Sequence, residues 1–401
     1  MERIIFHIDV NNAYLSWEAL YRIQELGESL DLRTIPSAIG GDRESRHGII
    51  LAKSMPARSY GVQTAETIGE ALKKCPNLVI VPPRRWVYKE NSRKLMELLR
   101  EYSPAVEQFS IDEAFVDMTG VSREMTSDPV LAAEVLRQAV RDRLGFTVNI
   151  GVSCNKMLAK MASDFQKPDR VHSLFPDEIQ EKMWPLPIRR LLFVGRSTEQ
   201  KLYNLGIRTI GDLAHSDKAI ICSHLGKHGA MVYNYANGID ESPVAAQAPD
   251  SKGYGNSTTI SHDVTDSHEA KDVLRRLCDS VGKRLQKDHV RARVVAVSIK
   301  NSDFMRYSHQ CTLATATDSP AELYQQACRL FDECWDGSPV RLLGVSTSKI
   351  TKDSLQQLNL FDHEKLEKKQ RLESAIDSIR SRYGKNAVMR ASEKQDEKNF
   401  G

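Results

Sequence analysis

The order of apolar segments in the first 167 residues limits the folds that this chain can adopt. An apolar run at 3–9 predicts a buried strand, and the helical spacing over 12–26 predicts an amphipathic helix. Residues 105–118 alternate like a hairpin, 129–144 predict a second amphipathic helix, and T-V-N-I-G-V-S at 147–153 predicts another strand. Strand, helix, hairpin, helix and strand is the ferredoxin-like order, so we expect an α+β fold.

Three carboxylates interrupt or end these predicted strands. Asp9 ends the first apolar run, and Asp112 and Glu113 stand inside the hairpin. Together they could hold a pair of Mg²⁺ ions that activates a hydroxyl nucleophile and steadies a leaving pyrophosphate. For either site alone, solvated acids at strand ends are the ordinary alternative. Neighbours on a regular strand face opposite ways, so Asp112 and Glu113 reach the same metals only if the hairpin twists, bulges or turns there.

Several motifs occur in a fixed order between the N-terminus and about Phe361. They are D-V-N-N-A-Y, A-I-G-G-D-R-E-S-R-H-G-I-I, P-A-R-S-Y-G-V, S-I-D-E-A-F-V-D and N-I-G-V-S-C-N-K-M-L-A-K. Together they resemble the Y-family of translesion DNA polymerases, most closely its bacterial polymerase IV type.

The resemblance implies a ferredoxin-like palm with a small fingers insertion, an all-helical thumb with a helix-hairpin-helix, and a separate α+β little finger. The expected divisions are 1–34 and 82–167 for the palm, 35–81 for the fingers, 168–241 for the thumb, 242–257 for a linker, 258–355 for the little finger and 356–401 for a tail. The linker is rich in Ala, Pro, Gly and Ser, which favours a loop.

The same resemblance gives the carboxylates a role. Asp9, Asp112 and Glu113 match the catalytic, metal-binding carboxylates of the palm, and the backbone carbonyl of Val10 would complete one metal site. The implied cofactor is Mg²⁺, with two ions per active site. Asn11 stands where many relatives have a further Asp, so we count no third carboxylate at that end.

The nucleotide-binding residues are also implied by the resemblance. Tyr14 has the family's offset from Asp9 for the steric gate, an aromatic ring that leaves no room for a 2′-hydroxyl; an ordinary core tyrosine is the alternative. Arg58 and Lys167 match cations that hold the incoming triphosphate, one as a bidentate fork and one as a point charge. The Tyr that often precedes this Arg by three positions is Met55 here, so a phosphate-contacting hydroxyl is lost.

Two regions match the family's DNA-binding parts. The segment around F-V-G-R-S-T-E-Q-K-L resembles a helix-hairpin-helix, in which backbone N–H groups near Gly195 would bind DNA phosphates, although Phe193 replaces the first glycine of the usual G-x-G. Residues 281–310 hold seven Lys and Arg against two Asp. Alternation could place Arg291 and Arg293 on one strand face along a DNA backbone, unless this is only a solvated charged face.

A short apolar peptide follows the last predicted strand. Gln357, Leu358, Leu360 and Phe361 look like the Q-L-x-L-F peptide by which bacterial polymerases dock on the sliding clamp. The Gln would hydrogen-bond a pocket rim while the apolar side chains fill pockets. The alternative is a stretch that folds back on its own domain.

The composition of the chain argues against several classes of protein. The net charge is only +3, so nucleic-acid binding has to rest on local patches. Seven scattered cysteines without a C-x-x-C pair argue against a zinc site or a disulfide framework and favour a reducing cytoplasm. No apolar run approaches about 18 residues and no basic leader precedes one, so we expect neither secretion nor membrane insertion.

We therefore expect a template-directed DNA polymerase of low fidelity, without proofreading, that acts as a monomer on primer–template DNA and dNTPs and docks on a sliding clamp. A nucleotidyl cyclase also uses a two-metal palm, but it has no use for the helix-hairpin-helix or the clamp peptide. A catalytically silent DNA-binding adaptor is the non-enzyme alternative, and the intact Asp9, Asp112 and Glu113 disfavour it.

Overall fold

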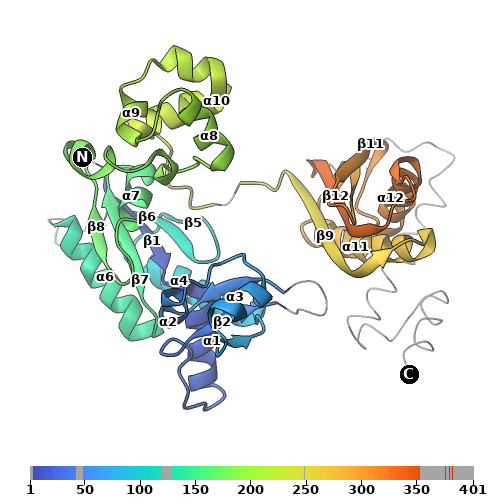
Figure 1. Cartoon of the computed structure of the whole chain (residues 1–401), viewed down its shortest axis with the longest axis horizontal. Coiled ribbons are helices and arrows are strands. Elements are labelled where there is room, and N and C mark those ends of the chain that lie inside the picture. The colour runs from blue at the N-terminus through green and yellow to red at the C-terminus, as the bar shows by residue number, and fades with distance from the viewer. Residues whose placement is uncertain are drawn as a thin grey trace. The chain divides into compact units, whose positions relative to one another are not determined.

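A computed structural model describes residues 3–41, 48–119, 121, 128–247 and 249–352 and the single positions 375, 379 and 382. The chain divides into two compact units, 1–250 and 251–401 (Figure 1). None of the helices in the described ranges has the length and apolar character of a membrane span. The predicted clamp peptide at 357–361 lies outside the described residues.

The first unit contains a five-stranded sheet with the order β5-β6-β1-β7-β8. Its strands are β1 (Ile5–Val10), β5 (Val106–Gln108), β6 (Glu113–Asp117), β7 (Val148–Ser153) and β8 (Val171–Ser173). The central strand β1 is antiparallel to both β6 and β7, which confirms the predicted ferredoxin-like order. The parallel edge strand β8 was not predicted, because three residues are too few to show a period.

Helices cover this sheet on both faces. They are α1 (Ala13–Gln24), α4 (Arg85–Tyr102), α6 (Pro129–Leu144) and α7 (Lys156–Ser163). The apolar residues of α1, α4 and α6 share one core with Phe6, Ile8 and Val10. The alternate residues of β1 face α7, which packs against β1 and β7. Gly151 on β7 makes this contact possible, since an added Cβ would overlap the carbonyl oxygen of Ala159 on α7.

A small three-stranded sheet with the order β3-β2-β4 is inserted between α1 and α4. It consists of β2 (Ser37–Gly40), β3 (Ile50–Lys53) and β4 (Val79–Val81), and is accompanied by α2 (Met55–Ser59) and α3 (Ile68–Lys74). It has a small apolar core of its own, which includes Ala38, Ile50, Ala57 and Leu78. This insertion occupies the region predicted to form the fingers.

The last part of the first unit is helical, as predicted for the thumb, but it begins later than the predicted 168, because residues 171–173 form β8 of the five-stranded sheet. Its elements are η1 (Pro176–Glu178), η2 (Ile179–Met183), η3 (Ile188–Arg190), α8 (Arg196–Asn204), α9 (Ile210–Ala214) and α10 (Lys218–Ala236). Phe193 lies in the turn before α8 with a φ of 66°, in the left-handed region that favours glycine, and half of its surface is exposed. The substitution of the expected glycine by Phe193 therefore did not remove the glycine-like backbone conformation.

The second unit is an α+β domain with the sheet order β11-β10-β12-β9. Its elements are β9 (Gly253–Val264), α11 (Ser267–Lys287), β10 (Arg291–Asn301), β11 (Arg306–Thr317), α12 (Pro320–Cys334) and β12 (Val340–Thr351). The two helices bury one face of the sheet in a single core. The predicted linker 242–257 is too long, because residues 253–257 already belong to β9. Gly253 is needed there for close strand pairing, since an added Cβ would overlap the carbonyl oxygen of Thr347.

Candidate active site

A pocket of about 360 Å³ in the first unit brings together residues from five separate stretches of sequence. Six of the residues predicted to be functional line it: Asp9, Val10, Tyr14, Arg58, Asp112 and Lys167. Asn11, Lys53 and Met55 line it as well. Glu113 is the predicted palm carboxylate that does not.

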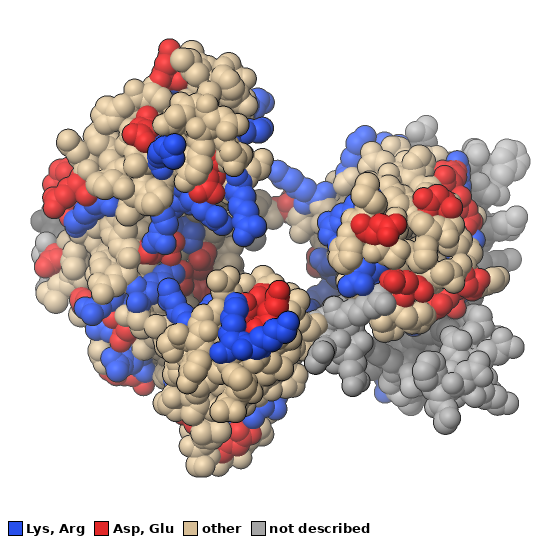
Figure 2. All heavy atoms as spheres, viewed as in Figure 1, with Lys and Arg blue, Asp and Glu red and all other residues tan. Residues whose placement is uncertain are grey.

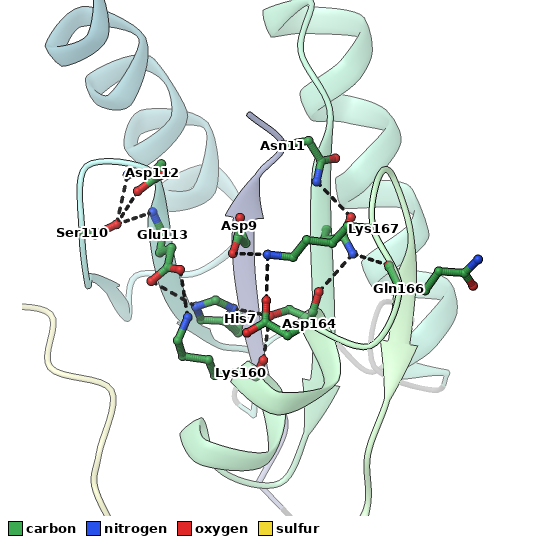
Figure 3. Close-up of polar contacts among 12 residues, drawn as sticks. His7, Asp9, Asn11, Ser110, Asp112, Glu113, Lys160, Asp164, Gln166 and Lys167 are labelled. Atoms are coloured by element: carbon green, nitrogen blue, oxygen red, sulfur yellow. Dashed lines mark hydrogen bonds and ion pairs between the residues drawn. The ribbon is translucent and has the colours of Figure 1, made fainter. Parts of the chain in front are cut away.

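Asp9 lies near the end of the central strand β1 and is 8% exposed. The ammonium of Lys167 donates to Asp9 Oδ2 over 2.7 Å and also pairs with Asp164 over 2.7 Å (Figure 3). Burial, together with the smaller effect of the charges of Glu113 and Asp164, raises the pKa of Asp9 to about 6 against the opposing charge of Lys167. One ammonium therefore does not fully compensate the negative charge buried at this site.

Asp112 lies in the turn that precedes β6, not on a regular strand. Ser110 organises this turn: its hydroxyl donates to Asp112 Oδ1 over 2.6 Å and accepts the backbone N–H groups of Asp112 and Glu113. The backbone N–H of Val10 donates to the carbonyl oxygen of Asp112 over 3.0 Å, which ties the turn to the end of β1. These contacts hold the Asp112 carboxylate at the pocket.

Glu113 is the first residue of β6 and pairs in register with Asp9. Its carboxylate accepts from Lys160 over 2.8 Å and approaches His7 Nε2 at 4.0 Å. The hydroxyl of Ser163 donates to the Lys160 carbonyl and so accepts from His7 Nδ1, which leaves Nε2 as the unprotonated nitrogen. Asp112 and Glu113 thus point to different surroundings, as expected for neighbours at the start of a strand.

The oxygen atoms of Asp9, Asp112 and the Val10 backbone fit a hard divalent cation such as Mg²⁺. The raised pKa of Asp9 points the same way, because a bound cation would favour the ionised carboxylate. Among the described residues, no three His, Cys, Asp or Glu side chains are grouped closely enough to hold a metal, and the carboxylate of Glu113 is bonded to Lys160.

Tyr14 lies in the first turn of α1, with its ring at the wall of the pocket. The ring stacks on that of Tyr88 from α4, with the centroids 4.6 Å apart and the planes 12° from parallel. Tyr88 is 1% exposed, and its hydroxyl has no hydrogen-bond partner among the described residues. Packing alone therefore holds Tyr88 as a platform that fixes the position of the Tyr14 ring.

Three cationic side chains line the same pocket as the carboxylates. Arg58 comes from α2, Lys167 follows α7, and Lys53, which the sequence did not suggest, comes from β3. Partial burial and the charge of Arg58 lower the pKa of Lys53. Met55 lies at the same wall and is 44% exposed, so its thioether offers only packing there.

The residues predicted to contact DNA lie outside this pocket. Gly195 is the N-cap of α8 in the first unit. Arg291 and Arg293 lie on β10 of the second unit on either side of the fully buried Ala292, so both point away from the helix-covered face. Figure 2 shows Lys and Arg side chains gathered in the hollow of the first unit, between the helical segment and the small inserted sheet.

Four residues of the site were missed by sequence reasoning: Lys53, Ser110, Asp164 and Tyr88. A Ser two positions before an Asp in a predicted turn is a recognisable signal for side-chain-to-backbone bonding. Tyr88 gave no such signal, because the ring on which it stacks, Tyr14, is distant in the sequence. Asp164 lies only three positions from Lys167, so its pairing could have been found from that spacing.

Comparisons with known proteins agree along the whole chain. Residues 8–164 match the impB/mucB/samB family, residues 251–360 match the C-terminal domain of that family, and residues 176–207 match its HHH motif. A DNA polymerase IV of Clostridium acetobutylicum is 43% identical over 98% of both chains. DNA polymerase IV 1 of Bacillus subtilis is 35% identical over 100% of this chain and 95% of its own.

A solved structure supports the fold. The Y-family DNA polymerase chimera Dbh-Dpo4(243-245)-Dbh superposes with a TM-score of 0.76 at 22% identity, covering 87% of this chain and 100% of its own. The predicted fold class, with a palm, a small fingers insertion, a helical thumb and a little finger, is confirmed.

The raised pKa of Asp9 predicts a pH-dependent stability. Between the usual value of 3.8 and about 6, the folded protein binds a proton that the unfolded chain does not, so stability falls as the pH rises through this window. At pH 8 in the presence of a chelator, we expect Asp9→Asn to raise the free energy of unfolding by about 2 kcal/mol. At pH 4 the two proteins should be equally stable in urea denaturation.

Asp31→Asn is the control with the opposite sign. Asp31 is partly buried, but hydrogen bonds from Arg33 lower its pKa, so its removal should cost stability at pH 8. An Asp9→Asn protein no more stable than the wild type at pH 8 would contradict the picture of an under-compensated carboxylate.

Proposed function

Because the chain belongs to the impB/mucB/samB family and, within it, to the DNA polymerase IV group of the Y-family, we propose that it extends a primer 3′-hydroxyl with dNTPs through a two-Mg²⁺ site. The family makes it a DNA-directed DNA polymerase of the translesion class. The number and identity of the metals, and the role of each residue below, are part of the proposal.

The observation that carries the proposal is the presence of both carboxylates and cations in one pocket. Carboxylate oxygens of Asp9 and Asp112 lie on the palm side, and the cations of Lys53, Arg58 and Lys167 lie near them. A metal-bound triphosphate needs both: hard oxygen ligands for the metals and cations for the remaining phosphate oxygens. The pocket lies at the end of the central palm strand, where a primer terminus can approach it from the hollow of the unit.

Each protein group has a separate task in this proposal. When bound, Mg²⁺ would supply charge neutralisation and a more acidic 3′-hydroxyl. Asp9, Asp112 and the Val10 carbonyl would hold it, with Glu113 joining them when it leaves Lys160. Arg58 would hold the triphosphate through two parallel hydrogen bonds, and Lys167 and Lys53 as point charges.

The wall opposite the phosphates would select the sugar. Tyr14 lies at the start of α1 next to Asp9, and the stacked ring of Tyr88 prevents it from moving back. A 2′-hydroxyl on the incoming nucleotide would collide with this fixed ring. The steric-gate role implied by the sequence resemblance is thus proposed here with Tyr88 as its support.

The small size of the inserted sheet supports the proposal that the enzyme has low fidelity. Its strands contain only three or four residues, so it offers little surface to test the shape of a new base pair. Such a lid would also accept damaged templates. We propose that the enzyme has no proofreading activity, since the longest described stretch that the family matches leave uncovered, 208–247, is too short for an exonuclease domain.

DNA would be held outside the pocket by the helical segment and the second unit. The backbone at Gly195, next to the exposed ring of Phe193, and the face of β10 with Arg291 and Arg293 are the proposed contacts. Contacts of this kind bind phosphates without reading sequence and weaken with salt. The clamp peptide at 357–361 would keep a monomeric polymerase at a high effective concentration on primed DNA.

Primer extension on undamaged and abasic templates with Mg²⁺ tests the reaction. We expect the wild type to extend both, and Asp112→Ala to lose more than about a hundredfold in rate because a metal ligand is missing. Asp117→Ala removes an acid at the far end of β6, the strand that Asp112 precedes, and serves as the matched control. A wild type that binds primer–template tightly but never extends it would support the silent adaptor instead.

Sugar selection is tested by competing ribonucleotides against dNTPs. Tyr14→Ala should lose about a hundredfold in discrimination against ribonucleotides and still extend with dNTPs, because only the steric barrier is removed. Tyr21→Ala, on the same helix and outside the pocket, should leave discrimination unchanged. Unchanged discrimination in Tyr14→Ala would remove this residue from the gate.

Clamp docking is tested by adding a bacterial sliding clamp to the extension assay. The double variant Leu360→Ala/Phe361→Ala should lose the stimulation by the clamp and keep clamp-free synthesis, since the peptide follows the last strand. Asn359→Ala, the variable position of the peptide, is the control. Loss of both activities in the double variant would mean that the peptide is structural.

A further inference from the structure

Lys167 is carried by a loop, residues 164–169, that follows α7 and returns to the sheet. Its ammonium reaches across the pocket to Asp9, although the loop has no strand or helix to hold it. The position of this cation therefore depends on what fixes the loop. Two buried asparagines, Asn11 and Asn149, each bond one backbone group of this loop, at Asp169 and Gln166 (Figure 3 labels Asn11). The side chains of His172 and Arg190 bond two further carbonyl oxygens, those of Gln166 and Asp164.

Asn149, on β7, is fully buried. Its amide nitrogen donates to the carbonyl oxygens of Ser163 and Gln166, over 3.0 and 2.7 Å, at the start of the loop. Its amide oxygen accepts from Asn11 Nδ2 over 3.1 Å. Because both carbonyl partners can only accept, the amide of Asn149 has one allowed orientation.

Asn11, next to the end of β1, is 7% exposed and holds the other end of the loop. Its amide oxygen accepts the backbone N–H of Asp169 over 2.9 Å and the Thr147 hydroxyl over 3.0 Å. The backbone N–H can only donate, so this amide is fixed as well, with its nitrogen toward Asn149. The two amides form one chain of hydrogen bonds that joins β1, β7 and both ends of the loop.

An Asp at position 11 or 149 would lose hydrogen bonds that the Asn makes. At position 149 it would face two carbonyl oxygens and donate to neither. At position 11 it could still accept from Asp169, but its second oxygen would oppose the amide oxygen of Asn149. Many relatives have Asp at position 11. The Asn at this position in the present protein is complementary to Asn149, because its amide nitrogen donates to the amide oxygen of Asn149.

We propose that Asn11 and Asn149 are positioning residues that present Lys167 to the triphosphate of the incoming nucleotide. The inference rests on the proposed function of the pocket. Asp169 strengthens the same arrangement, since its carboxylate accepts from Arg137 and Arg141 on α6 over 2.6 and 3.0 Å. The loop is thus held at both ends, and Lys167 is oriented before any nucleotide arrives.

The kinetic test uses Asn149→Ala and Asn11→Ala, which free the loop from opposite ends. Each should raise KM for dNTP about tenfold and change kcat by less than about threefold, because the loop is loosened and the carboxylates are untouched. Thr147→Val is the matched control, since it removes one bond from Asn11 without touching the loop. Thermal unfolding identifies any variant that fails to fold, and the other variant then carries the test.

A double-mutant cycle with Lys167→Ala separates positioning from a direct contact. If the amides act through Lys167, Asn149→Ala should change KM by less than about twofold in the Lys167→Ala background. Independent, multiplying effects of the two substitutions would overturn the proposal.

Hydrogen exchange gives a readout that needs no polymerase activity. The peptide that contains 164–169 should exchange about tenfold faster in Asn11→Ala, above all at the Asp169 N–H, while the 105–117 hairpin keeps its wild-type rate. An unchanged loop would overturn the inference even if the wild type polymerises. A loosened loop in a wild type that never extends primers would instead contradict the proposed function alone.

Discussion

The pairing of one central strand with two neighbours is the constraint on which the site depends. Asp9 on β1 lies opposite Glu113 on β6 and opposite Asn149 on β7. A shift of one residue in either ladder would turn Asp9 to the other face of the sheet, into the core formed with α1, α4 and α6. The buried residues Phe6, Ile8 and Val10 set this register, so the apolar core fixes where the acids stand.

The buried charge in the pocket lowers the stability of the folded protein. The Asp9 carboxylate is buried beside two further acids and pairs with a single ammonium. Its pKa is therefore raised, and the ionised site has too little positive charge to balance it. Asp9 and Asp164 in turn raise the pKa of Lys167 despite its burial, so that the ammonium stays charged. An arrangement of this kind is typical of functional sites, where perturbed ionisation is retained because the reaction needs it.

Much of the fold could be predicted from the sequence, because long apolar periods such as 129–144 and alternation such as 291–301 mark helices and strands directly. Asp9, Asp112 and Tyr14 were predicted from short contiguous motifs that resemble those of the Y-family. The rest depended on contacts between distant stretches. Nothing near Asn149 shows that it meets Gln166, and Gly253 looks like a loop residue until the strand beside it is known. The clamp peptide remains a prediction.

The two larger sheets, the five-stranded sheet of the first unit and the four-stranded sheet of the second, differ in the length of their edge strands. The palm sheet ends on both sides in strands of only three residues, β5 and β8. The sheet of the second unit ends in β9 and β11, each of twelve residues. Long unpaired edges are templates on which another chain can add a strand, whereas short ones offer few free N–H and C=O groups. Among the described strands at sheet edges, β9 and β11 are therefore the longest, and they are where solubility would be engineered.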